Sequence, residues 1–271
     1  MRRQFIRASI VAFGLLVTCF VGHADEPKTD AKAIVQLAVK TELDANRNDH
    51  SRFLYLDVDQ KPNIKVTQWV AETQEGDLHC VLEENGHKLS HAEQAHKMNA
   101  FASSSDQREQ QKKAGKHDDD QATKLLKLLP DGFTWSAAGD RDGNTLLRFK
   151  PNPNFHPPDR ESRVLAAMEG EMAVNDEQHR IVSVKGHLTR DVKFGGGLLA
   201  TLKAGGTFDV ERREIGERIW QITETHVHIE GHALLFRSIS EQEDEQKSKF
   251  HQLPGDVSLA QAQKELMQRG Q

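Results

Sequence analysis

Three histidines, His226, His228 and His232, come closest by type and spacing to a metal site. In a strand, His226 and His228 would face the same side, and imidazole is a common zinc ligand. No cysteine joins them and no glutamate lies at a catalytic motif distance. We therefore expect a solvent-facing strand without a metal. A histidine-based metal site or hydrolase stays open as an alternative.

The other motifs that would indicate an enzyme are missing or lack their context. Gly195-Gly196-Gly197 has neither the spacing nor the lysine of a phosphate-binding loop. Gly-x-Ser-x-Gly and His-Glu-x-x-His do not occur. We therefore expect a protein that is not an enzyme and needs no cofactor.

Aromatic residues in strand-like segments are the candidates for binding. A curved sheet buries its concave face against its own helices or against an apolar guest. If there is a guest, we expect six aromatic side chains to line the cavity, namely Trp69, Trp135, Phe149, Phe194, Trp220 and Phe236. A shift of one residue in the register of a strand would reverse the face on which its residues lie.

The first 24 residues have the pattern of a secretory signal peptide. Arg2, Arg3 and Arg7 precede an apolar run from Ala8 to Val21, and Gly22-His23-Ala24 offers small residues for cleavage after Ala24. An apolar run of about 14 residues is too short to span a bilayer of roughly 30 Å. We expect a periplasmic or secreted protein with no transmembrane segment after cleavage. An uncleaved anchor, or a lipid on Cys19, is the alternative.

Charge and cysteine content narrow the function further. Cleavage would remove three arginines and no acid, so the net charge would change from −5 to −8. An acidic chain without clustered Lys and Arg does not favour nucleic-acid binding. Only Cys80 would remain, so a disulfide within one chain is excluded. We expect a small buried hydrophobic residue at Cys80 and a monomeric protein.

The order of the predicted elements indicates a mainly β, α+β fold. Connections between successive strands are short, so neighbouring strands should pair antiparallel. We expect a large curved antiparallel sheet, or unclosed half-barrel, with helices packed on its concave face. The expected helices are 30–46, two segments within about 88–130, and a C-terminal helix from Ser258; the expected strands are 53–58, 64–70, 78–82 and most of 133–245.

Two helices are expected to begin with capping boxes, Ser90 with Glu93 and Ser258 with Gln261. Between Asp106 and Asp120 the chain is almost wholly polar, which indicates a solvated helix or a mobile crossing. Pro130-Asp131-Gly132 should end the helix that carries Leu125 to Leu129.

The expected domain organisation follows from this order. It comprises a signal peptide (1–24), an N-terminal helical segment (25–50), a half-barrel (51–250) with a helical insertion at about 88–130, and a C-terminal helical tail (251–271).

Four stretches between residues 145 and 240 carry a resemblance to secreted proteins of soil bacteria, Acidobacteria especially. They are Pro151–Phe155, Pro157–Arg163, Ala167–Gly170 and Val192–Leu199. That group has no assigned activity. From Val58 onward the order of elements also resembles the outer-membrane lipoprotein-sorting carriers LolA and LolB.

This resemblance implies an unclosed half-barrel whose helices form a lid. It also implies a hydrophobic cavity that binds an acyl chain of a lipid or lipoprotein. The alternative is a structural or protein-interaction module of the cell envelope with no small ligand. Fold alone does not decide between them.

Overall fold

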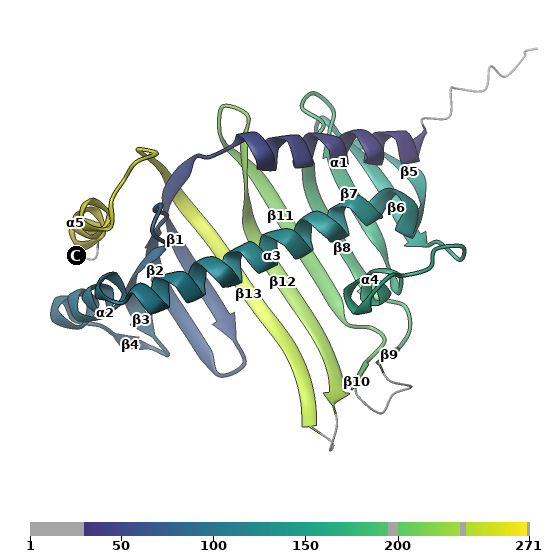
Figure 1. The fold of residues 1–271 in the computed structure, drawn as a ribbon. Helices are drawn as coiled ribbons and strands as arrows, with labels where there is room; N and C mark the ends of the chain where they lie inside the picture. The colour runs from purple at the N-terminus through teal and green to yellow at the C-terminus, as the bar shows by residue number, and fades with distance from the viewer. Residues whose placement is uncertain (1–29, 195–199, 234–236, 270–271) are drawn as a thin grey trace, which may run out of the picture.

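The structure is a computed structural model and describes residues 30–194, 200–233 and 237–269. Its centre is one open antiparallel sheet of 13 strands (Figure 1). Eleven of them follow the order β4-β3-β2-β1-β13-β12-β11-β8-β7-β6-β5, and β9 and β10 form a side branch on β12. The predicted fold class, a large curved antiparallel sheet that stays unclosed, is confirmed.

The strands are β1 (Arg52–Lys61), β2 (Ile64–Ala71), β3 (Leu78–Glu84), β4 (His87–Lys88), β5 (Phe133–Arg141), β6 (Asn144–Pro151), β7 (Met168–Asn175), β8 (Ile181–Leu188), β9 (Val192–Phe194), β10 (Ala200–Leu202), β11 (Thr207–Gly216), β12 (Ile219–Ala233) and β13 (Arg237–Leu253). The helices are α1 (Ala31–Asn48), α2 (His91–Ser103), α3 (Ser105–Gly132), α4 (Arg160–Leu165) and α5 (Leu259–Arg269). Within the described ranges, no helix is both long and apolar enough to cross a membrane.

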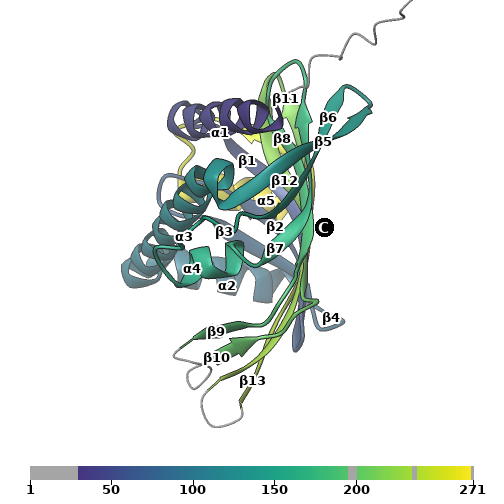
Figure 2. The same ribbon diagram turned by 90° about the vertical axis from the view of Figure 1, so that its right-hand side faces the viewer.

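Helices pack on both faces of the sheet. Strand β1 is apolar on both faces, but among the described residues Phe53 and Tyr55 pack with Phe250 and other strand residues and not with a helix. Leu54 packs with Trp69 and Cys80 beneath α2 and α5. The register, carried strand by strand, places Met172 and Val184 on the opposite face, where they pack against α1. That second face is the one toward which the sheet curves, and α1, α3 and α4 lie in front of it (Figure 2).

Helix α3 is 28 residues long and crosses the concave face as a bridge (Figure 1). At its start, the Gln111 side-chain amide donates to the Asp77 carbonyl oxygen (3.0 Å) and accepts from the Asp77 N–H (2.7 Å). At its end, Leu126 and Leu129 pack against the α1 core. Residues 112–120 are all exposed, so the middle of the helix is bounded by solvent and not by the sheet.

The long polar stretch is thus helical, and it is one helix with the leucine-rich segment. The helix ends within Pro130-Asp131-Gly132, as predicted, and its last residue is Gly132. A proline within the last turn clashes only with the turn before it, and the tertiary contacts of Leu126 and Leu129 offset that cost.

Candidate functional site

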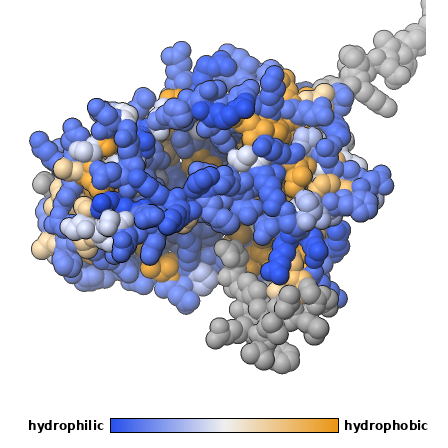
Figure 3. Space-filling view, in the orientation of Figure 1, coloured by the Kyte–Doolittle hydropathy of each residue, from blue (hydrophilic) through white to orange (hydrophobic). Residues whose placement is uncertain are grey.

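A groove of about 960 Å³ lies between α1, α3 and the concave face. We call it the α1–α3 groove. In the space-filling view, hydrophobic side chains lie deep beside the hydrophilic ridge of α3 (Figure 3). Its apolar lining consists of Val39, Leu43, Ala45, Ala122, Leu126, Ile181, Trp220 and Ile222.

Helix α1 forms one wall of the groove because its apolar face extends past the core contact into the groove. Asp30 caps the helix by accepting from the Lys32 and Ala33 backbone N–H groups. Val35 and Ala38 are fully buried against the sheet. Val39 and Leu43, one and two turns further along the helix, belong both to this core and to the groove lining.

Ile222 on β12 is a large apolar residue of the groove that is exposed. Its exposed fraction is 40%, whereas Val39 and Ile181 are each 6% exposed. An isolated exposed isoleucine is common on protein surfaces. Ile222 lies beside Trp220 in the lining of the groove, so the groove exposes apolar surface that a guest could cover.

A buried ionic cluster forms the base of the groove. The Glu42 side chain of α1 is 4% exposed and accepts two hydrogen bonds from Arg180, at 3.0 Å from Nε and 2.9 Å from Nη2. Arg212 of β11 lies with Nη1 2.6 Å from Glu42 Oε1. The Ile181 backbone N–H donates to the same oxygen at 2.8 Å.

Burial alone would raise the pKa of Glu42. The hydrogen bond from Arg180 and the charge of Arg212 outweigh this effect, so the pKa is lowered and Glu42 is ionised at neutral pH. Two guanidinium groups then share one carboxylate. The cluster therefore has a net charge of about +1, because Arg is always protonated in proteins.

The rim of the groove carries further charges. Arg47 pairs with Asp44. Lys40 and Lys127 also line the groove, and neither forms an ion pair with a described residue. Asp49 and Asp119 also line the groove, so its rim carries charges of both signs and the surplus of positive charge lies at its base.

A second set of buried polar groups lies on β1 and β2. Burial raises the pKa of the Glu72 carboxyl to about 7, even though this group accepts a hydrogen bond from the Phe53 N–H (2.8 Å). Burial also raises the pKa of Asp57. Asp57 accepts from Gln68 through one oxygen, and its Oδ1 has no partner among the described residues.

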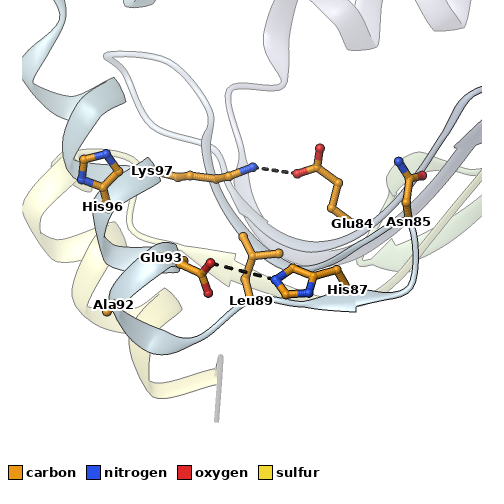
Figure 4. Close-up of a pocket in the computed structure, with 8 residues that line it drawn as sticks. All are labelled: Glu84, Asn85, His87, Leu89, Ala92, Glu93, His96 and Lys97. Atoms are coloured by element: carbon orange, nitrogen blue, oxygen red, sulfur yellow. Dashed lines mark hydrogen bonds and ion pairs between the residues drawn. The ribbon is translucent and has the colours of Figure 1, made fainter.

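A smaller hollow of about 510 Å³ lies between the β3–β4 hairpin and α2 (Figure 4). Lys97 reaches Glu84 across it at 2.7 Å, and His87 Nε2 lies 4.0 Å from Glu93. Most of the side chains around it are exposed, and the charged ones pair across it. The hollow is therefore a surface depression between ion pairs.

The predicted cavity residues fall into different parts of the molecule. Trp220 lines the α1–α3 groove, and its indole N–H donates to Gln178 Oε1 at 3.0 Å. Trp135 and Phe149 pack on each other, with ring centroids 5.5 Å apart, close to the α1 core. Trp69 is 7% exposed in the core beneath α2 and α5, on the other face of the sheet.

Phe194 packs with Leu188 and Val192 near the β9–β10 branch. Phe236 lies outside the described residues. Of the five predicted residues that are described, the structure brings only Trp135 and Phe149 into contact and places only Trp220 in the groove.

The histidines of β12 lie on the face opposite the groove. His226 and His228 do share that face, but His226 Nδ1 lies 2.6 Å from Asp244, which raises the pKa of His226. The side chain of His232 is outside the description. Among the residues that the structure describes, no three His, Cys, Asp or Glu side chains are placed to hold a metal ion.

Sequence reasoning missed the residues that shape the groove, namely Glu42, Arg180, Arg212 and Ile222. Glu42 lies 138 residues from Arg180, and the sequence contains no pattern that pairs them. The one available signal was an acidic residue within the apolar stripe of α1, since a carboxylate there must find a cationic partner.

No family model, curated protein or solved structure matches this chain.

Proposed function

We propose that this chain is an exported, non-enzymatic protein that binds an acyl chain of a lipid or lipoprotein in the α1–α3 groove. One observation carries the proposal. The groove contains a cluster of apolar side chains among polar ones and is bounded by a bridging helix whose middle, residues 112–120, is exposed. A volume of about 960 Å³ lies at the upper end of the ~300–1,000 Å³ that is typical of small-molecule sites.

The driving force would be burial of apolar surface. Each methylene removed from water contributes about 0.8 kcal/mol. Ile222 and Trp220 on the floor, with Leu126 on α3, offer surface that a chain could cover. Binding would be sequestration, without a chemical step.

The bridging helix supplies a route of entry in this proposal. Helix α3 is held near its start by the Gln111–Asp77 hydrogen bonds and at its end by the leucines of the α1 core. An outward movement of its middle would uncover no buried side chain, because those residues are exposed. The helix would then act as a lid.

The proposed location is the periplasm or the exterior. It rests on the basic and apolar pattern of residues 1–24. The likeness to LolA and LolB carriers in the order of elements agrees with that location and remains part of the proposal.

The test is native mass spectrometry of the exported chain purified from a periplasm, with lipid extraction in parallel. We expect a bound acyl species that is lost when Trp220 is changed to Ser. A Trp69→Ser variant serves as the comparison, because Trp69 lies on the other face of the sheet. A mass without ligand, together with no uptake of offered fatty acids, phospholipids or lipopeptides, would contradict the proposal and favour the protein-interaction module.

A further inference from the structure

We propose that the α1–α3 groove selects amphiphiles with an anionic head, a carboxylate or a phosphate, and that Arg212 is the residue that binds this head. This inference rests on the proposed function. It adds the chemical class of the ligand, which an apolar groove alone does not specify.

The first argument is the charge at the base of the groove. Glu42 is the one described carboxylate in contact with Arg180 and Arg212, so the cluster has one more positive than negative charge. Surplus charge with little access to water is costly unless a counter-charge approaches it. An anion in the groove would provide that counter-charge.

The second argument is the hydrogen-bonding capacity of Arg212. Its Nη1 donates to Glu42 and to the Ile181 carbonyl oxygen (3.2 Å), and its Nη2 donates to the Trp220 carbonyl oxygen (3.4 Å). A guanidinium has five N–H donors. Its Nε–H and one Nη2–H therefore have no partner among the described residues.

Arg180 shows what this pair of nitrogens can bind. It uses its own Nε and Nη2 to hold both oxygens of Glu42. In Arg212 the same two nitrogens keep one N–H each without a described partner, and this side chain lines the groove with 16% of its surface exposed. A second carboxylate, or a phosphate, would fit the same fork.

The third argument is the contrast with the rest of the chain. The protein is acidic, with a net charge of −5, so its surface in general repels anions. The charged side chains that line the groove are five cations, Lys40, Arg47, Lys127, Arg180 and Arg212, and four carboxylates, Glu42, Asp44, Asp49 and Asp119, so the lining as a whole has a net charge of about +1. An anionic amphiphile would therefore find its favourable site in the groove.

The test compares three probes that share a twelve-carbon chain and differ in the head, namely dodecanoate, dodecanol and dodecylamine. Their affinities are measured by titration calorimetry at pH 7.5 and low salt. We expect dodecanoate to bind at least about tenfold more tightly than dodecanol, and dodecylamine to bind most weakly. Raising the salt concentration should reduce the preference.

Variants assign the preference to the groove. Lys40→Glu with Lys127→Glu should reduce the affinity for dodecanoate and leave that for dodecanol unchanged. Arg212→Lys keeps the positive charge near Glu42 but removes the paired Nε and Nη2 donors. It should abolish most of the preference for dodecanoate over dodecanol. Lys112→Glu is the matched control, because Lys112 is an exposed residue of α3 outside the groove lining.

Dodecyl phosphate is a fourth probe that distinguishes a phosphate head from a carboxylate head. Equal affinity for all heads, or a preference that Arg212→Lys leaves intact, would overturn the inference while the proposed function stands. No binding of any probe, together with the ligand-free mass described above, would overturn the proposed function as well.

Discussion

Glu42 joins helix α1 to the sheet, because it contacts Arg180, Arg212 and the Ile181 backbone. Replacing Glu42 with Ala would leave two buried guanidiniums without a carboxylate. We expect a loss of about 3–5 kcal/mol in the free energy of unfolding at pH 7, measured by urea denaturation. The lowered pKa of Glu42 means that its contribution is lost as the pH falls through that pKa, so the difference between variant and parent should shrink in acid.

The matched control is Asp44→Ala on the same helix. The Asp44–Arg47 pair is solvent-exposed, and such pairs contribute about 0–1 kcal/mol. If the two substitutions lowered the free energy of unfolding equally, the Glu42 cluster would not be what holds α1 to the sheet.

Glu72 gives a pH dependence of the opposite sign. Burial raises its pKa from 4.5 to about 7, so the folded state binds the proton more tightly than the unfolded state does. Its stabilising contribution is complete below pH 4.5 and is lost as the pH rises through about 7. We expect Glu72→Gln to be more stable than the parent by about 3 kcal/mol at pH 8 and to match it near pH 4.5, measured by urea denaturation.

The hydrogen bond from the Phe53 N–H survives in this variant, since the amide oxygen of the introduced glutamine can accept it. Glu75→Gln, at an exposed neighbouring carboxylate, is the control. A Glu72→Gln variant that is less stable than the parent at pH 8 would show that the carboxylate is held by partners that outweigh its burial.

For single residues, the sequence predicts which side chains are apolar but not what each of them contacts. Cys80 is fully buried, as its place between Leu78 and Leu82 indicates. Trp69 was expected beside Trp220, yet the strand register places it on the other face of the sheet. Register depends on cross-strand pairing between distant segments, and a local pattern does not contain it.

Helix α3 is the element whose stability is least uniform. Its ends have tertiary partners, whereas residues 112–120 are exposed and include Gly115, which costs helix stability. We expect backbone amides of 112–120 to exchange hydrogen faster than those of 124–129, measured by hydrogen exchange with mass spectrometry.

Gly115→Ala tests the same helix with a substitution that should stabilise its middle. A Cβ at this position meets no atom within 4 Å, so the substitution should stabilise the helix by about 0.5–1 kcal/mol and slow the exchange of residues 112–120. Unchanged exchange would indicate that the middle of α3 is held by contacts outside the described residues.

Elements with strong local signals were predictable. Both capping boxes are present, with Ser90 bonded to Glu93 and Ser258 to Gln261. The meander of β1, β2 and β3 follows from its strand formers and turns. Helix α4 was missed because the prolines before it indicate an extended segment, although Asp159 then caps a helix of only 6 residues.

The whole molecule is an open sheet with one face bridged by a helix and a groove at the edge of the α1 core. The sequence predicts the sheet and the order of its helices, because alternation and turn residues are local. The groove arises where α1, α3, β8, β11 and β12 meet, and their mutual placement is a property of the folded chain.

The central claim is that the α1–α3 groove binds an acyl chain, and two isoleucines test it most directly. Ile222 lines the groove and is 40% exposed, whereas Ile64 on β2 lies outside the groove lining and is 39% exposed. Aspartate at either position should cost little stability. In a calorimetric titration with dodecanoate, we predict that Ile222→Asp weakens binding at least about tenfold and Ile64→Asp leaves it unchanged. Equal affinities for the two variants would contradict the claim.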